Sequence, residues 1–147
     1  MTPTEKPIQQ FEWDERKEDA QSERYMKWLH ANIALPPHTA FFNVSSANHL
    51  LSTSHVSSKY KFSGTLDVAV IDDAYASRSF VVCGIKIGFE LKNVTTYNDN
   101  QAIIKLLIAG LSSEYAVVMV LTNLRNVWRF FWLEKTEQDI YVTRKVI

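Results

Sequence analysis

Three charged residues, Asp67, Glu90 and Lys92, stand in the two most apolar stretches of this 147-residue chain. Asp67 interrupts the run 66–71, whose other members are Leu, Val, Ala and Ile, while Glu90 and Lys92 close the run 80–92. A carboxylate buried in such a strand must be paired with a cation, protonated or bound to a metal ion, because an isolated buried charge is costly. These three residues are therefore the first place to look for chemistry.

Alternation along the second run predicts which of its side chains share a face, because successive side chains of a strand point to opposite sides. One face carries Ile85, Ile87, Phe89 and Leu91, and the other carries Lys86, Gly88, Glu90 and Lys92. A bulge at Gly84 or Gly88 would disturb this pattern. Asp72 is an odd number of residues from Asp67, so we expect Asp67 and Glu90 to converge while Asp72 points away.

The elements that must position these residues can be read from periodicity and breakers. In chain order we expect a helix over 14–33, strands over 39–44, 66–71 and 80–92, a helix over 100–111, and strands over 116–121, 127–133 and 139–147. The segment 45–61 is polar and predicts a loop, and Asn98 or Asp99 should cap the second helix. The helix over 100–111 is apolar nearly all round, so we expect it to be sandwiched against the sheet. The order predicts an α/β fold with a mixed sheet flanked by helices.

Composition sets wider limits. Hydrophobic residues make up 46% of the chain, enough for one domain with a substantial core, and no run is long and apolar enough to span a bilayer. The single cysteine, Cys83, excludes an internal disulfide and favours a reducing, intracellular compartment. The first 24 residues carry seven acids and four bases, whereas the remainder has nine acids and 12 bases. We expect residues 1–12 to form a disordered acidic leader and residues 13–147 a single domain.

Two stretches resemble known proteins. The segment 64–67 (Gly-Thr-Leu-Asp), followed by 89–92 (Phe-Glu-Leu-Lys), resembles the Asp…Glu-x-Lys signature of the PD-(D/E)xK nuclease superfamily, and Gln101 resembles the glutamine that several branches carry after the lysine. The run 120–132 resembles the nuclease-like domains of Crinkler-type effectors of oomycetes and fungi. The resemblance covers about residues 20–133 and implies a restriction-endonuclease-like core of order α-β-β-β-α-β, here followed by C-terminal strands.

The resemblance implies a metal-dependent nuclease-like domain that hydrolyses phosphodiester bonds of nucleic acid, with DNA favoured. Asp67 and Glu90 would hold Mg²⁺ or Mn²⁺, which prefers oxygen ligands and needs only one or two carboxylates. Lys92 would position water or stabilise charge, Gln101 would orient Lys92 or the water, and Lys105 would contact a phosphate. The family also suggests the nucleus of a host cell as the place of action. No membrane partner is expected.

Other interpretations stay open. Glu90 and Lys92 could form a buried structural ion pair with Asp67 capping a turn, and the domain could keep the nuclease fold as a catalytically inactive module that binds protein or nucleic acid. Glu23 could add an acid to the site, although a solvated helix acid explains it better. Trp128, Phe130 and Trp132 share one face of their strand, which favours core packing, or a partner surface or base-stacking platform if that face is exposed.

Overall fold

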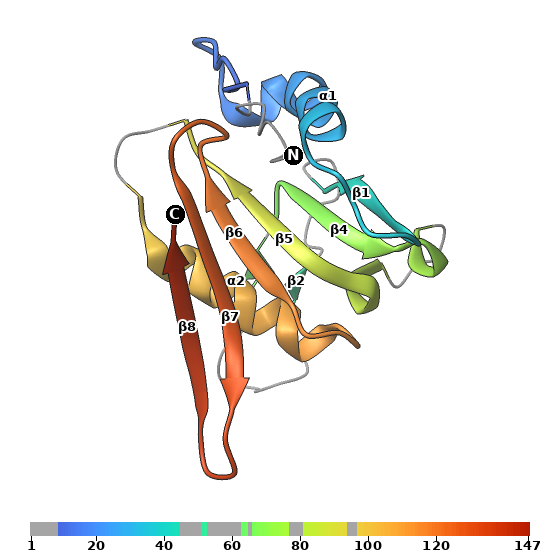
Figure 1. The fold of residues 1–147 in the computed structure, drawn as a ribbon, viewed down its shortest axis with the longest axis vertical. Helices are drawn as coiled ribbons and strands as arrows, with labels where there is room; N and C mark the ends of the chain where they lie inside the picture. Colours follow the sequence, from blue (N-terminus) through green and yellow to red (C-terminus); the bar gives the residue numbers. More distant parts are fainter. Residues whose placement is uncertain (1–8, 45–50, 53–62, 65, 77–80, 94–96) are drawn as a thin grey trace, which may run out of the picture.

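The fold is a six-stranded mixed sheet with one helix against each face, as seen in a computed structural model (Figure 1). The structure describes residues 9–44, 51–52, 63–64, 66–76, 81–93 and 97–147. Most of the predicted loop 45–61 lies outside these residues, and so do residues 1–8 of the expected leader. Residues 9–12 pack on the domain, where Phe11 is buried and its N–H donates to the carbonyl of Leu124.

Two helices and six long strands make up the architecture. In chain order they are α1 (Ser22–Asn32), β1 (Thr39–Asn43), β4 (Val68–Asp72), β5 (Ile85–Leu91), α2 (Asp99–Ser112), β6 (Val118–Thr122), β7 (Trp128–Lys135) and β8 (Ile140–Val146). The shorter elements are the 3-10 helices η1 (Glu18–Gln21), η2 (Asp73–Tyr75) and η3 (Val81–Gly84) and a two-stranded sheet of β2 (Leu51–Ser52) and β3 (Ser63–Gly64). The expected mixed α/β fold is confirmed.

The strand order in the large sheet is β1-β4-β5-β6-β7-β8. Among the described strands, only β5 and β6 run parallel, which agrees with the continuously apolar sequence of β6, and α2 is the crossover between them. β8, in the range predicted as the last strand, lies at the edge of the sheet, and the β7–β8 hairpin projects past the other strands (Figure 1). The carboxyl ends of β5 and β6 therefore lie at the same edge of the sheet.

The β5 strand is shorter and less regular than the sequence predicted. Residues 81–84 form η3 instead of continuing the strand, and a register shift against β4 leaves Lys86 between Ile85, opposite Ile71, and Ile87, opposite Val70. Ile85 consequently belongs to the core on the α2 side, whereas Ile87 packs with the α1 side. The expectation that Ile85 shares a face with Ile87 was wrong, because a bulge at Lys86 reverses the alternation there.

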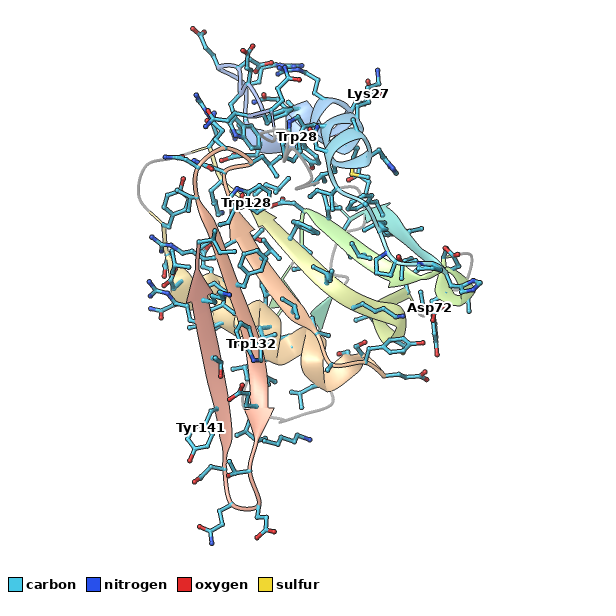
Figure 2. The ribbon with its side chains drawn as sticks, viewed as in Figure 1. Lys27, Trp28, Asp72, Trp128, Trp132 and Tyr141 are labelled. Atoms are coloured by element: carbon cyan, nitrogen blue, oxygen red, sulfur yellow. The ribbon has the colours of Figure 1, made fainter. Side chains whose placement is uncertain are left out.

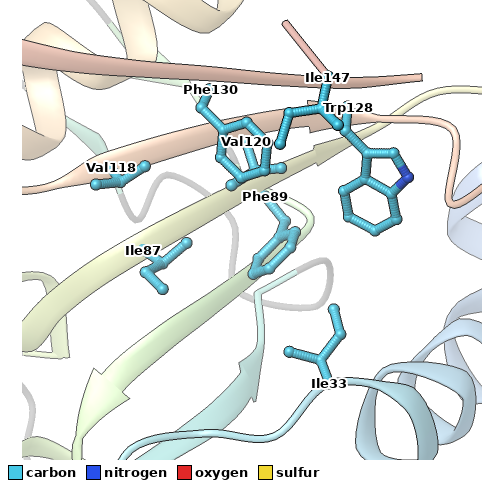
Figure 3. Close-up of a pocket in the computed structure, with 8 residues that line it drawn as sticks. All are labelled: Ile33, Ile87, Phe89, Val118, Val120, Trp128, Phe130 and Ile147. Atoms are coloured by element: carbon cyan, nitrogen blue, oxygen red, sulfur yellow. The ribbon is translucent and has the colours of Figure 1, made fainter. Parts of the chain in front are cut away.

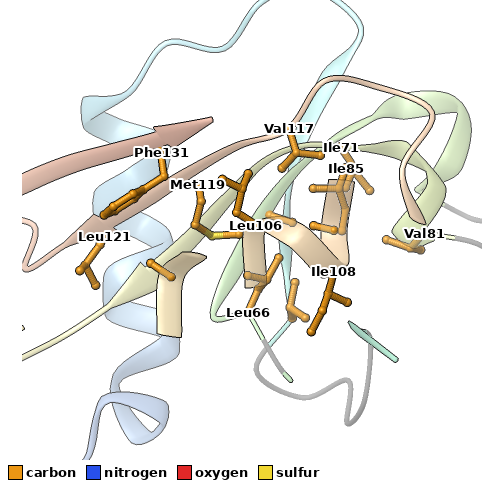
Figure 4. Packing of buried hydrophobic residues seen from close by; sticks show 14 residues of the cluster. Leu66, Ile71, Val81, Ile85, Leu106, Ile108, Val117, Met119, Leu121 and Phe131 are labelled. Carbon is orange, nitrogen blue, oxygen red and sulfur yellow. The ribbon is translucent and has the colours of Figure 1, made fainter. Parts of the chain in front are cut away.

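The core consists of two apolar clusters, one on each face of the sheet. The α2-side cluster gathers Leu106 and Ile108 of the helix with Met119, Leu121 and Phe131 of the strands (Figure 4). On the other face Tyr25 and Leu29 of α1 pack over β4, β5 and β6. Helix α2 is not sandwiched as expected: it buries one side only and leaves Ile104, Leu107 and Leu111 exposed.

Local signals explain where the helices begin and end. The side chain of Asn98 accepts a hydrogen bond from the Asn100 N–H at 3.0 Å, which makes Asn98 the cap of α2, one of the two expected capping residues. Helix α1 ends at Asn32, a few residues before the pair Pro36-Pro37. No helix among the described residues is long and apolar enough to cross a membrane.

Candidate functional site

Glu90 is the centre of a polar cluster buried beneath α2. It lies near the end of β5, only 3% exposed, on the face that carries Gly88. Its two carboxylate oxygens contact two ammonium groups, Lys92 Nζ at 3.0 Å and Lys105 Nζ at 2.5 Å. Lys92 directly follows β5 and Lys105 lies in α2. The buried carboxylate of Glu90 is therefore compensated by cations from two parts of the chain.

Asp67 lies beside Glu90 on the neighbouring strand. Its N–H donates to the Phe89 carbonyl at 3.1 Å, and its carboxylate accepts the Leu91 N–H at 2.7 Å. Asp67 therefore contacts the β5 backbone on either side of Glu90, through its N–H at Phe89 and through its carboxylate at Leu91. Asp67 and Glu90 are thus brought together, as the strand pattern predicted.

Burial and the neighbouring charge of Glu90 raise the pKa of Asp67 to about 7, against the opposing effects of the Leu91 hydrogen bond and the two lysines. Desolvation disfavours the ionised carboxyl, and a second carboxylate nearby disfavours it further. Near pH 7 a small change in the surroundings of Asp67 would therefore change its protonation state. A carboxyl of this kind is common at functional sites.

Lys92 occupies the rim of the cluster. Its N–H donates to the Thr122 carbonyl at 3.0 Å, so it follows β5 at the carboxyl edge of the parallel pair. Its side chain is 32% exposed. Partial burial lowers the pKa of Lys92, but the charge and hydrogen bond of Glu90, with the charges of Asp67 and Glu18, outweigh burial and raise it. Lys92 is a charged ammonium that reaches both Glu90 and solvent.

Glu18 is a site residue that the sequence did not point to. It lies in η1, before α1, and its Oε1 accepts the Asn93 N–H at 3.1 Å. Its charge contributes to the raised pKa of Lys92. From the sequence, Glu23 was the candidate for an additional acid at the site, but it is exposed on α1. The sequence did not indicate Glu18, because the irregular stretch before α1 has no periodicity from which the direction of a side chain can be predicted.

The two polar residues of α2 lie differently from their expected roles. Lys105 reaches inward to Glu90 and its side chain is only 17% exposed. Gln101, in the first turn of α2, is exposed, and its side chain makes no hydrogen bond to the described part of the chain. Gln101 is therefore not brought to Lys92 here, and its role in catalysis stays a prediction.

Asp72 stands at the opposite end of β4 from Asp67. Its carboxylate accepts hydrogen bonds from the Tyr115 hydroxyl at 2.7 Å and the Ala74 N–H at 2.9 Å, with Lys86 Nζ at 4.0 Å. Figure 2 shows Asp72 far from the β7 side of the sheet. Asp72 is a turn residue outside the cluster.

The aromatic stripe of β7 lies on the face away from Glu90. Trp128 stacks on Trp28 of α1 with ring centroids 6.4 Å apart (Figure 2), which supports core packing for this ring. Trp128 and Phe130 also line an open apolar hollow of about 450 Å³ (Figure 3), together with Ile33, Ile87, Phe89, Val118, Val120 and Ile147. This hollow and the polar cluster are on opposite faces of the sheet, so they do not form one site.

The donor set of the cluster suits a hard divalent cation. Asp67 and Glu90 offer carboxylate oxygens on adjacent strands, and one or two carboxylates are enough for Mg²⁺, which keeps several waters. No group of three or more His, Cys, Asp or Glu side chains is arranged around a common point in the described part of the chain. Both Glu90 oxygens contact lysines, so a cation would take the place of an ammonium group that now balances the charge.

Comparison with known proteins identifies distant relatives. The chain is 26% identical over 141 residues to Crinkler effector protein 2 of Phytophthora infestans, an alignment that covers 90% of this chain and 31% of that protein. It is 27% identical over 141 residues to Crinkler effector protein 4 of Phytophthora capsici, covering 90% and 33%, and 27% identical over 138 residues to Crinkler effector protein 63 of Phytophthora sojae, covering 88% and 31%. No family model and no solved structure matches the chain. The chain thus spans about a third of the length of the curated relatives it matches.

Proposed function

We propose that this domain is a metal-dependent nuclease-like domain that hydrolyses phosphodiester bonds of nucleic acid, with DNA as the favoured substrate. The observation that carries the proposal is the adjacency of Asp67 and Glu90 on neighbouring strands, with Lys92 two residues after Glu90 and in contact with it. The relation to Crinkler effector proteins supports an effector role, and the host-cell nucleus is the proposed place of action.

In this proposal Asp67 and Glu90 hold Mg²⁺ or Mn²⁺. The cation would supply electrostatic stabilisation of the phosphate and a more acidic water for attack. Lys92, charged and partly open to solvent, holds the phosphate oxygen or the attacking water in place. Lys105 balances Glu90 in the absence of metal and becomes free to contact a phosphate once Glu90 has another cation.

The order of elements is consistent with a restriction-endonuclease-like core. Leaving aside the short elements, the chain runs α1-β1-β4-β5-α2-β6, an α-β-β-β-α-β order, before β7 and β8. The cluster lies where the carboxyl ends of the parallel strands β5 and β6 meet, an edge at which open α/β sheets commonly bind ligands. Both features support the proposed fold relationship.

The proposal is tested by a metal-titrated cleavage assay. Supercoiled plasmid DNA and a structured RNA are incubated with the chain over a range of Mg²⁺ and Mn²⁺ concentrations. We expect cleavage that requires metal and is lost in Glu90→Gln, with Glu137→Gln as a control that removes an exposed charge at the β7–β8 turn. Cleavage of neither substrate at any metal concentration would contradict the nuclease proposal.

A second candidate is a catalytically inactive module that uses the same fold to bind nucleic acid or protein. The specific observation in its favour is that Lys92 and Lys105 already neutralise Glu90 without a metal. A buried carboxylate satisfied in this way can serve structure alone. The same assay separates the two, because the module would not cleave with wild type or with either variant.

A further inference from the structure

Arg129 is a further basic residue that lies in line with Glu90 across the sheet. The register pairs Glu90 with Leu121 and Leu121 with Arg129, so Arg129 is two strands away in the same row. Two steps of roughly 4.8 Å put the backbones of these residues about 9.6 Å apart. Arg129 faces α2, as Glu90 does, because its guanidinium contacts Asp99 in the first turn of that helix.

Two arginines converge on the single carboxylate of Asp99. Arg129 Nη1 lies 2.6 Å from Asp99 Oδ1, and Arg144 Nη1 of β8 lies 2.8 Å from Asp99 Oδ2. The guanidinium of Arg129 also stands over the ring of Tyr97, with Cζ 5.2 Å from its centroid. Three separate elements, α2, β7 and β8, thus meet at one anionic group.

The charges of this cluster do not balance. Asp99 supplies one negative charge to two guanidinium groups, and Arg129 Nε is buried without a hydrogen-bond partner among the described residues. A buried donor without a partner costs free energy, and a guanidinium has more N–H groups than one carboxylate oxygen can satisfy. The geometry suits an anion with more acceptor oxygens than Asp99 offers, and a phosphate is such an anion.

We propose that Arg129 and Arg144 form a subsite for a backbone phosphate of nucleic acid, which Asp99 occupies as an internal anion until the substrate displaces it. This inference rests on the proposed function, since the subsite would hold the strand next to the Glu90 cluster. Arg144 is 51% exposed and open to an incoming strand, whereas Arg129 is 25% exposed and fixed by Tyr97. Asp99, once displaced, remains in the first turn of α2, where a negative charge is favourable.

The test is oligonucleotide binding in EDTA, so that neither metal nor cleavage enters the measurement. Fluorescence anisotropy is recorded with labelled single-stranded and duplex DNA and with RNA of the same sequence, from 50 to 200 mM salt. Asp99→Asn frees both arginines and should tighten binding about tenfold, with the salt dependence steeper by about one phosphate contact. Glu137→Gln makes the same change in charge at the β7–β8 turn and should leave affinity nearly unchanged.

A structural role for the cluster predicts the opposite outcome. If Asp99 serves only to fasten the β7–β8 hairpin to α2, Asp99→Asn lowers stability in urea and binds nucleic acid no better than Glu137→Gln, which would overturn the proposal. Arg144→Gln in the Asp99→Asn background should return affinity to the wild-type value if the subsite is real. Tighter binding without any cleavage in the metal assay would support the subsite while contradicting the nuclease proposal, so the two claims can fail separately.

Discussion

At the scale of single residues, the main property of the site is the near balance of positive and negative charges beneath α2. Glu90 contacts two lysines, and Asp67, the residue before β4, has its pKa raised to about 7 by burial and by the charge of Glu90. Without a metal the cluster therefore holds two ammonium groups, one carboxylate and one carboxyl close to its titration point. A divalent cation could replace ammonium charge and allow Asp67 to ionise.

Asp67 makes stability depend on pH in a direction that is unusual for a carboxyl. The unfolded chain loses this proton near the ordinary aspartate pKa of 3.8, whereas the folded chain keeps it up to about pH 7. The folded state thus binds more protons between these values, so its stability falls as the pH rises from 4 to 7. Asp67→Asn mimics the protonated carboxyl and should be more stable than wild type at pH 8 by about 2 to 4 kcal/mol, but similar at pH 4.

Urea unfolding of wild type and Asp67→Asn at pH 4, 6 and 8 checks this prediction. Asp73→Asn is the control, because Asp73 is an exposed aspartate directly after β4. Equal stability differences at all three pH values would mean that folding does not raise the pKa of Asp67.

Lys92→Ala separates catalysis from structure. Because Lys105 still contacts Glu90, the variant should lose only about 1.5 to 3 kcal/mol of unfolding free energy, the contribution of a hydrogen bond to a charged group. Cleavage should fall by roughly a hundredfold, as expected for one lost electrostatic contact in the transition state. Both quantities are measured on the same sample, with Lys135→Ala as a matched exposed lysine.

Removing both lysines leaves Glu90 buried without a counter-charge, so Lys92→Ala/Lys105→Ala should cost about 3 to 5 kcal/mol. A similar loss in Lys92→Ala alone would show that Lys92 serves the fold first, and any lost activity would then follow unfolding.

Which site residues the sequence could predict depends on the regularity of their surroundings. The contact between Glu90 and Lys92 was predictable because the end of β5, after the bulge, keeps strict alternation, whereas Asp67 was singled out because it interrupts an apolar run. The inward direction of Lys105 could not be predicted, because α2 is apolar nearly all round and offers no clear polar face. The ion pair between Arg129 and Asp99 could not be predicted either, because it depends on how α2 packs against β7.

At the scale of elements, the pairing of β4 with β5 positions the site and contains one bulge. The bulge at Lys86 turns Ile85 to the α2 side, while Gly88 and Glu90 keep the face that the sequence predicted. The sequence named Gly84 or Gly88 as the place of a bulge, since glycine tolerates one best. Glycine serves a different purpose here, which is close packing against neighbouring side chains.

Gly84 and Gly88 should differ in their tolerance of a methyl group. A Cβ at Gly84 would lie 2.6 Å from Cβ and Cγ of Tyr75, atoms near the backbone that cannot move aside. A Cβ at Gly88 would lie 2.8 Å from the terminal methyl of Met119, the end of a flexible side chain. Gly84→Ala should therefore cost about 3 kcal/mol and Gly88→Ala about 1 kcal/mol.

Thermal or urea unfolding of the two glycine variants measures the difference. A larger loss for Gly88→Ala would mean that Met119 and Leu66 beneath Glu90 are packed more rigidly than the contact next to Tyr75.

Most elements were predictable because each is bounded by a strong local signal. Pro36-Pro37 follows α1, Asn98 caps α2, and the apolar run 116–121 predicted the strand β6. The residues 81–84 were not predicted as a 3-10 helix, because Val81 and Val82 favour strand and only tertiary packing overrides that preference.

At the scale of the whole molecule, the two faces of the sheet serve different ends. The α2 face carries the polar cluster of Glu90 and, two strands away, the arginine cluster around Asp99. The α1 face carries the aromatic stripe and the apolar hollow, because α1 covers only part of the sheet there (Figures 1 and 3). The chemistry proposed here belongs to one face and to one edge of the sheet.

The central claim, that Asp67 and Glu90 together hold a divalent metal, is tested most directly by calorimetric titration with Mg²⁺ and Mn²⁺ at pH 7 in two buffers of different ionisation heat. Because burial and the charge of Glu90 raise the pKa of Asp67 to about 7, metal binding at this pH should release protons from Asp67. Glu90→Gln should abolish binding, and Asp67→Asn should weaken it and abolish the proton release. Binding that persists in Glu90→Gln, or no detectable binding by wild type at millimolar metal, would contradict the account.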